Sequence, residues 1–151
     1  MQLHSQLDVF RGKNVLITGG LGFIGSNLAI RLVELGANVT LMDNMLPGHG
    51  GNLFNIEPIR QRVSLTFSDI RDANVMNYLV KDQDYLFHLA GQVDHITSLT
   101  NPYPDIDINI RGTATVVEAC RHRPDPETST IVLASSTKET GTPVATLNIS
   151  P

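Results

Sequence analysis

The 151-residue sequence predicts an α/β fold with a doubly wound parallel sheet. The first observation is that five short apolar runs alternate with segments in which apolar residues recur at helical spacing. The second is that four of these runs lack a clear polar face, as expected when helices cover both faces of a parallel sheet. The third is a cluster of glycines directly after the first run. We therefore expect one domain with about five strands.

The first strand ends at the glycine cluster, and a helix begins directly after it. The glycines fit both GxGxxG and GxxGxxG, because the cluster contains Gly19, Gly20, Gly22 and Gly25. Such a turn leaves backbone N–H groups unpaired at the positive end of a helix, and glycines let a pyrophosphate approach them. We expect a dinucleotide to bind here.

A second apolar strand, residues 37–43, ends in an acid, Asp43, which lies 18 residues after Gly25. A carboxylate at this place can accept hydrogen bonds from both ribose hydroxyls of the adenosine half, and it would repel a 2′-phosphate. Asp43 therefore favours NAD over NADP. The alternative is a glycine-rich turn in an α/β protein that binds nothing.

Three further strands are expected at residues 63–67, 85–90 and 129–134. Asp72 is expected to cap the helix that follows the third strand. A long helix precedes the fifth strand, and its predicted buried stripe comprises Ile106, Ile110, Ala114 and Val117. The chain is predicted to be truncated before a sixth strand, which would leave the fifth at an open edge of the sheet.

Residues at the carboxyl ends of the strands are the first candidates for a site, because ligands bind there in open parallel sheets. Asp69 could accept a hydrogen bond from an adenine amino group, with Ile70 beside the ring; alternatively, it is a turn acid that caps the next helix. Ser136 could donate a hydrogen bond to a substrate oxygen near a nicotinamide; alternatively, it caps a turn. Spacing alone leaves these alternatives open.

The composition argues against several classes of function. Eleven basic and fifteen acidic residues give a net charge of -4, and no Lys/Arg cluster indicates a nucleic-acid or anionic membrane surface. The single cysteine, Cys120, excludes an internal disulfide and is expected in the core, as is His88. His49 and His95 lack metal-ligand spacing, so we expect no metal. Because no apolar run has signal-peptide or membrane-spanning length, the expected location is cytoplasmic.

Several motifs occur together and in order along the chain. They are Thr18-Gly19-Gly20-Leu21-Gly22-Phe23-Ile24-Gly25, Asp43-Asn44, Asp69-Ile70-Arg71-Asp72, His88-Leu89-Ala90-Gly91-Gln92, Asn109 with Gly112-Thr113, and Ala134-Ser135-Ser136 with Gly141. With these motifs the chain resembles the extended short-chain dehydrogenase/reductase family, the NAD-dependent nucleotide-sugar epimerases and dehydratases. The resemblance covers nearly the whole chain and implies a Rossmann-type sheet, NAD as cofactor and a nucleotide-sugar substrate.

The resemblance also assigns roles to residues. It implies that NAD is bound by Gly19, Gly22, Phe23, Ile24, Gly25, Asp43, Asn44, Asp69, Ile70, Leu89, Ala90, Gly91 and Asn109. Among these, Asp69 and Ile70 are implied to lie at the adenine, and Asn109 near the active site. Ser136 matches the active-site Ser/Thr of the family, which hydrogen-bonds the sugar oxygen at the oxidised carbon. In the family, a hydride passes from that carbon to NAD while a tyrosinate, in a Tyr-x-x-x-Lys motif, removes the hydroxyl proton.

Two departures from the family's pattern shape the functional expectation. The sequence has no Tyr-x-x-x-Lys motif and no C-terminal substrate-binding part, so residues 1–151 are expected to form an incomplete NAD-binding domain. Thr137-Lys138 follow Ser136 where dehydratases usually have Asp-Glu, which favours the epimerase branch. The alternative is a catalytically inactive NAD-binding module, or a half-enzyme that needs a second polypeptide. Family members often dimerise through helices that this chain partly retains, so a homodimer is a further expectation of the resemblance.

Overall fold

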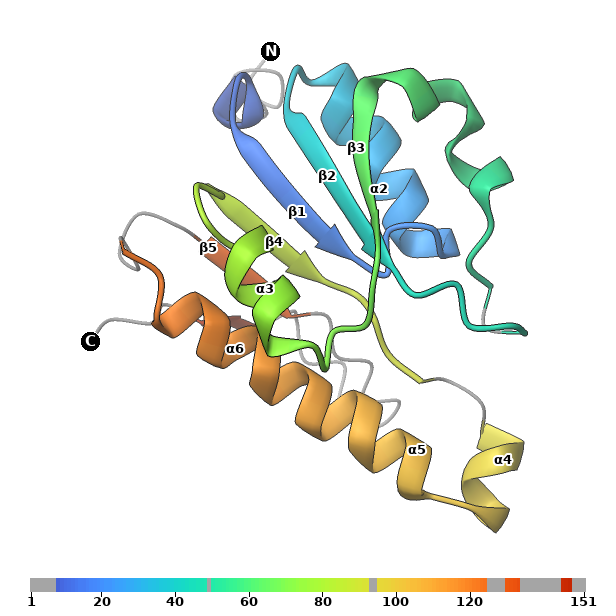
Figure 1. Cartoon of the computed structure of the whole chain (residues 1–151). Helices are drawn as coiled ribbons and strands as arrows, with labels where there is room; N and C mark the ends of the chain where they lie inside the picture. Colours follow the sequence, from blue (N-terminus) through green and yellow to red (C-terminus); the bar gives the residue numbers. More distant parts are fainter. Residues whose placement is uncertain (1–7, 49, 93–94, 125–129, 134–144, 148–151) are drawn as a thin grey trace.

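The structure is a computed structural model, and it describes residues 8–48, 50–92, 95–124, 130–133 and 145–147. Within these residues, six strands form one sheet in the order β3-β2-β1-β4-β5-β6 (Figure 1). The strands are β1 (Asn14–Thr18), β2 (Asn38–Asp43), β3 (Val63–Phe67), β4 (Tyr85–His88), β5 (Thr130–Leu133) and β6 (Ala145–Leu147). The first five strands run parallel, which confirms the predicted doubly wound sheet.

Helical segments connect the strands. They are η1 (Asp8–Phe10), α2 (Phe23–Glu34), η2 (Leu53–Arg62), α3 (Ala73–Leu79), α4 (His95–Thr100), α5 (Tyr103–Asp105), η3 (Ile106–Gly112) and α6 (Thr113–Arg121). Asp72 caps α3 as predicted, since its side chain accepts hydrogen bonds from the backbone N of Asn74 and Val75. In the part of the chain that the structure describes, no helix is long and apolar enough to span a bilayer.

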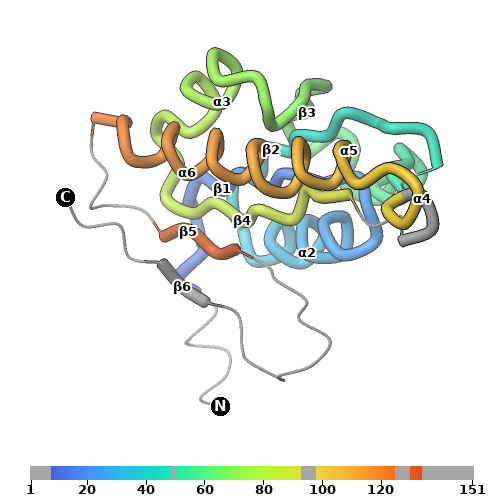
Figure 2. The backbone as a smooth tube through the Cα atoms, turned by 90° about the horizontal axis from the view of Figure 1, so that it is seen from below, coloured from blue at the N-terminus to red at the C-terminus, as the bar shows by residue number. Residues whose placement is uncertain are grey.

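Helices cover both faces of the sheet, because successive residues of a strand point to opposite faces. On one face, α2 and η2 pack against Val15 and Ile17 of β1. On the other face, α3 and α6 pack against Leu16, and Cys120 is 2% exposed in this core, as predicted. In Figure 2, α5, η3 and α6 form one continuous rod that runs along the sheet.

The expected open edge beside the fifth strand is wrong. β6 pairs antiparallel with β5, with Val132 opposite Thr146. The segment from Ser135 onward is polar in sequence, and a strand of three residues is too short for an alternating pattern to be recognised. A sixth strand is therefore present, and it runs opposite to the other five.

The predicted stripe of the long helix is also wrong. Ile106 and Ile110 are 49% and 65% exposed, whereas Ile108 and Val116 are buried. The buried residues Ile108, Gly112 and Val116 are spaced as in an ordinary helix, so the buried stripe has the expected period but lies on another face. Which face is buried depends on what packs against it, and here Ile70 lies on the backbone of Gly112.

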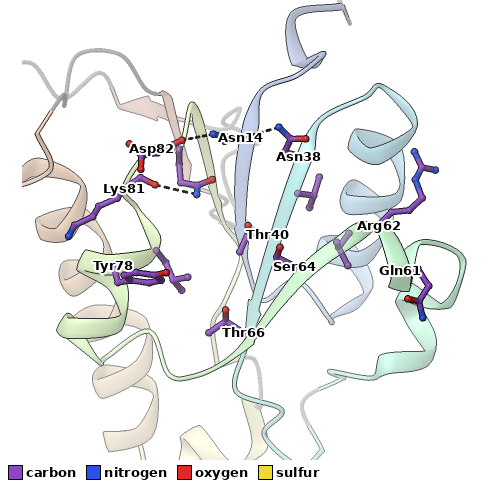
Figure 3. A pocket seen from close by; sticks show the side chains of 14 residues that line it. Asn14, Asn38, Thr40, Gln61, Arg62, Ser64, Thr66, Tyr78, Lys81 and Asp82 are labelled. Atoms are coloured by element: carbon purple, nitrogen blue, oxygen red, sulfur yellow. Dashed lines mark hydrogen bonds between the residues drawn. The ribbon is translucent and has the colours of Figure 1, made fainter.

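A polar groove of about 830 Å³ lies beside β2, β3 and α3 (Figure 3). Its lining includes Thr40, Ser64, Thr66 and Tyr78. It extends to the amino ends of β1 and β2, where Asn38 Nδ2 donates a hydrogen bond to Asn14 Oδ1. Because ligands of open parallel sheets bind beyond the carboxyl ends of the strands, this groove is not the candidate cofactor site.

Candidate functional site

The candidate site lies along the carboxyl edge of the sheet, and its centre is the turn between β1 and α2. α2 begins after Gly22, whose backbone is extended (φ -72°, ψ 173°), and no side chain caps it. The first N–H groups of a helix have no intrahelical acceptor, so they can bind an anion at the positive end of the helix. Phe23 and Ile24 at this end are 82% and 67% exposed. The turn therefore has the chemistry of a pyrophosphate site.

Close backbone contacts explain two of the glycines in this turn. A Cβ on Gly25 would lie 2.3 Å from the carbonyl oxygen of Gly19. A Cβ on Gly19 would lie 2.7 Å from the backbone N of Ala90, and its φ of +68° also favours glycine. A Cβ on Gly22 would meet only the carbonyl oxygen of Gly19, at 3.4 Å. The turn thus packs on the segment after β4 at Gly19, whereas at Gly22 there is room for a side chain.

Asp43 at the end of β2 is attached to the same turn. Its Oδ2 accepts a hydrogen bond from the backbone N of Leu21 (3.1 Å), and its Oδ1 accepts one from Met45 (2.9 Å). A carboxylate has about four acceptor positions, so each oxygen can still accept a hydrogen bond from a hydroxyl. Asn44 comes next, and its Nδ2 donates to Asp69 Oδ2 at 3.3 Å. The ends of β2 and β3 are therefore linked.

Asp69, just after β3, is held by Arg71. The backbone N and Nε of Arg71 donate to Asp69 Oδ1, both at 2.9 Å, and Nη2 donates to Oδ2 at 2.7 Å. Hydrogen bonds from the Arg71 side chain lower the pKa of Asp69 from 3.8 to about 2. Arg71 also pairs with Asp107 on η3. Asp69 is thus an ionised acceptor near pH 7, and the cap of α3 is Asp72 instead.

A buried polar chain joins the ends of β1 and β4 to the start of α6. The His88 ring, in a residue 5% exposed, is hydrogen-bonded through Nδ1 to Thr18 Oγ1 (2.7 Å) and through Nε2 to Thr113 Oγ1 (3.0 Å). Thr18 Oγ1 also accepts from the backbone N of Ala90 (3.3 Å). Burial lowers the pKa of His88 to about 4, so the ring is neutral near pH 7. The predicted packed histidine is confirmed.

Asn109 on η3 fixes the loop that follows β4. Its Oδ1 accepts a hydrogen bond from the backbone N of Gln92 (2.7 Å), and its Nδ2 donates to the carbonyl oxygen of Gln92 (3.1 Å). A Cβ on Gly91 would lie 3.2 Å from this Oδ1. The backbone N of Leu89 donates to the carbonyl oxygen of Thr18 (3.1 Å). The loop is therefore held between β1 and η3.

The structure brings the predicted cofactor residues to one edge of the sheet. They are Gly19, Gly22, Phe23, Ile24 and Gly25 after β1, Asp43 and Asn44 at β2, Asp69 and Ile70 after β3, Leu89, Ala90 and Gly91 after β4, and Asn109 on η3. Ser136, the predicted catalytic residue, lies outside the described residues. Arg71, which holds Asp69, and Asp107, which holds Arg71, were not among the predicted site residues; the Asp-x-Arg spacing was the available signal for the first pair. No group of three or more His, Cys, Asp or Glu among the described residues could hold a metal ion.

Comparison with known proteins shows what the chain is similar to. A CDP-paratose 2-epimerase from Salmonella typhi is 39% identical over 111 residues, which cover 71% of this chain and 32% of that protein. A dTDP-glucose 4,6-dehydratase from Mycolicibacterium smegmatis is 34% identical over 110 residues, with the same coverage of 71% and 32%. A solved UDP-glucose-4-epimerase from Stenotrophomonas maltophila, with bound NAD and formylated UDP-arabinopyranose, has a TM-score of 0.72 and 27% identity, covering 83% of this chain and 38% of that one.

The match to a family model extends over most of the chain. The model of the NAD dependent epimerase/dehydratase family matches residues 15–148, which run from β1 through β6. The chain spans about a third of the length of the relatives described above. By its sequence, its strand order and these relatives, the chain belongs to the NAD-dependent epimerase/dehydratase family of extended short-chain dehydrogenases/reductases.

Proposed function

We propose that this chain is the NAD-binding portion of a nucleotide-sugar epimerase or dehydratase, with the epimerase branch favoured. The observation that carries the proposal is the uncapped start of α2 beside Asp43, with Asp69 at the end of the next strand along the edge. These three features match the pyrophosphate, ribose and adenine of one dinucleotide. The fit supports residues 1–151 as an NAD-binding domain, to which a substrate-binding part would add the rest of the active site.

Each part of the edge has a role in this proposal. The N–H groups at the start of α2 bind the pyrophosphate, and the free acceptor positions of Asp43 bind the ribose hydroxyls. Asp69 accepts a hydrogen bond from the adenine amino group, with the backbone of Ile70 beside the ring, because the Ile70 side chain is only 5% exposed. The loop after β4, which Asn109 holds in place, borders the nicotinamide half.

The chemistry follows from the family. When bound, NAD would supply an acceptor for a hydride from a sugar carbon. Ser136 would donate a hydrogen bond to the sugar oxygen at that carbon. The favoured epimerase branch rests on Thr137-Lys138, which follow Ser136 where dehydratases usually have Asp-Glu.

Calorimetric titration of the purified chain with NAD and with NADP tests the proposal. We expect NAD to bind more tightly than NADP, because the Asp43 carboxylate repels a 2′-phosphate. Asp43→Ala is expected to weaken NAD binding and to reduce the preference for NAD. Its thermal unfolding must be recorded too, since Asp43 also accepts hydrogen bonds from Leu21 and Met45. A folded chain that binds neither dinucleotide, or that prefers NADP, would contradict the proposal.

A second candidate is a binding module without turnover, or a half-enzyme completed by a second polypeptide. The 151 residues contain no Tyr-x-x-x-Lys segment. Both candidates bind NAD, so binding does not separate them. The reading frame does, because the first candidate holds if the frame continues into a Tyr-x-x-x-Lys segment.

We also propose that the outer face of α5 and η3 contacts a second copy of this chain. Tyr103, Ile106 and Ile110 are exposed there and line a hollow of about 650 Å³ together with Arg71 and Arg111. Exposed apolar side chains gathered on one face are typical of protein interfaces. Sedimentation analysis is expected to give a dimer that Ile110→Asp disrupts, and a monomer at all concentrations would contradict this proposal.

A further inference from the structure

The carboxylate of Asp69 is surrounded by hydrogen-bond donors. Oδ1 accepts from the backbone N and Nε of Arg71, both at 2.9 Å, and Oδ2 accepts from Arg71 Nη2 at 2.7 Å and Asn44 Nδ2 at 3.3 Å. Four donors fill the acceptor positions that a carboxylate offers. The contact from Asn44 is the longest, so it is the one that another donor can replace most easily.

Arg71 is itself held from the opposite side. Its Nη1 donates to Asp107 on η3, and Asp107 also accepts from Arg111 Nη1 at 3.0 Å. The planar guanidinium therefore lies between two carboxylates that are 38 residues apart in sequence, and it pairs with Asp69 as a fork. This arrangement fixes the plane of the Asp69 carboxylate relative to η3.

A second contact links the segment Asp69–Ile70 to η3. A Cβ on Gly112 would lie 2.5 Å from Ile70 Cδ1, so the Ile70 side chain lies directly on the backbone of Gly112. Ile70 is 5% exposed and belongs to the core below α6. Asp69 is thus linked to η3 through Arg71 and Asp107, and Ile70 is linked to it through the contact with Gly112.

We propose that Arg71 is a positioning residue for adenine recognition. It holds Asp69 so that one acceptor position of the carboxylate points toward the exocyclic amino group of the adenine. That amino group then replaces the Asn44 amide as the hydrogen-bond donor. The inference rests on the proposed NAD binding and deepens it. It makes the Asp69–Arg71 pair responsible for preferring adenine over a base that carries a carbonyl at the same position. A carbonyl oxygen there would face a carboxylate oxygen, and two acceptors repel each other.

The carboxylate of Asp69 carries the charge that this preference needs. An ordinary pKa of 3.8 would already leave it ionised near neutrality, and hydrogen bonds from Arg71 lower that pKa to about 2, so it has no proton to offer a carbonyl. Without the fork, the carboxylate keeps only the backbone N–H of Arg71 and the amide of Asn44 and can rotate. Loss of Arg71 should therefore affect the choice of base more than the binding of the pyrophosphate.

The experiment is a calorimetric comparison of NAD with nicotinamide hypoxanthine dinucleotide, whose base has a carbonyl in place of the amino group. The wild-type chain is expected to prefer NAD, and Arg71→Met is expected to reduce the ratio of the two affinities roughly tenfold. Arg71→Lys keeps the charge but not the fork, so it should recover only part of the ratio. Arg121→Met removes an arginine that pairs with Glu118 on α6 and contacts neither Asp69 nor Asp107, so it is the matched control and should leave the ratio unchanged.

The outcomes separate this inference from the proposed function. If the wild-type chain binds NAD but shows no preference, or if folded Arg71→Met or Arg71→Lys keeps the full ratio, Arg71 does not position Asp69 and the cofactor site still stands. If the folded wild-type chain binds neither dinucleotide, the proposed function fails and the inference fails with it. Circular dichroism of each variant establishes that the compared chains are folded.

Discussion

The two ends of the candidate cofactor site are built in different ways. The pyrophosphate turn is made by seven consecutive residues, Gly19 to Gly25, and two of its glycines, Gly19 and Gly25, are explained by backbone contacts within the turn and with Ala90. The adenine end depends on Asp69, Arg71 and Asp107, which come together through an ion pair between segments 36 residues apart. The first end is therefore set by local backbone geometry, and the second by tertiary packing of η3.

The largest expected effect separates two glycines of the turn. Gly25→Ala places a methyl group 2.3 Å from a backbone oxygen that cannot easily move, so it should lower the free energy of unfolding by about 3 kcal/mol and abolish NAD binding. Gly22→Ala meets only ordinary contact at 3.4 Å, so stability should change by less than about 0.5 kcal/mol while NAD binding weakens. Urea unfolding and calorimetry of both variants measure this. Equal losses of stability would show that the two glycines are not distinguished by backbone packing.

The next effect tests the buried face of η3. Ile108→Ala should cost about 2 to 3 kcal/mol of stability, because this side chain is 9% exposed and lies in the core below α6. Ile110→Ala is the matched control, and as Ile110 is 65% exposed it should cost less than about 0.5 kcal/mol. Chemical denaturation of dilute samples compares the two. The reverse order would restore the stripe expected from the sequence and contradict the burial of Ile108.

A pH effect is expected from His88, which links the end of β1 to the start of α6. Its pKa is about 4 in the folded chain and about 6.5 when unfolded, so between these values the unfolded chain binds a proton that the folded chain does not. Stability should therefore fall as pH is lowered from about 6.5 to about 4, by up to about 3 kcal/mol from this residue. Thermal unfolding against pH should be flatter for His88→Gln. An identical pH profile in the two proteins would rule out a buried neutral His88.

The smallest effect probes the contact between Ile70 and η3. Gly112→Ala would press against the flexible end of Ile70, so a loss of about 1 kcal/mol is expected. Ile70→Val removes the Cδ1 atom that lies closest, so in the double variant the cost of Gly112→Ala should be smaller. A double-mutant cycle by urea unfolding measures this coupling, and additive losses would mean that the two residues do not touch.

The difference between the two ends also explains how far the sequence predicts this molecule. The parallel sheet, the glycine turn and the Asp72 cap are predicted correctly because each depends on residues close in sequence. The buried face of residues 106–112 is not, since the face that a helix turns to the core depends on tertiary packing, here that of Ile70 on Gly112. The pairing of β6 with β5 is missed for another reason, because a strand of three residues has too little pattern.

The central claim is that one edge of this sheet binds NAD along its whole length. Two-dimensional amide NMR of the isotopically labelled chain during titration with NAD tests it most directly. The account predicts chemical-shift changes together at the Gly19 to Gly25 turn, at Asp43, and at Asp69 and Ile70. Changes confined to the polar groove of Figure 3, or no changes at saturating NAD, would contradict it.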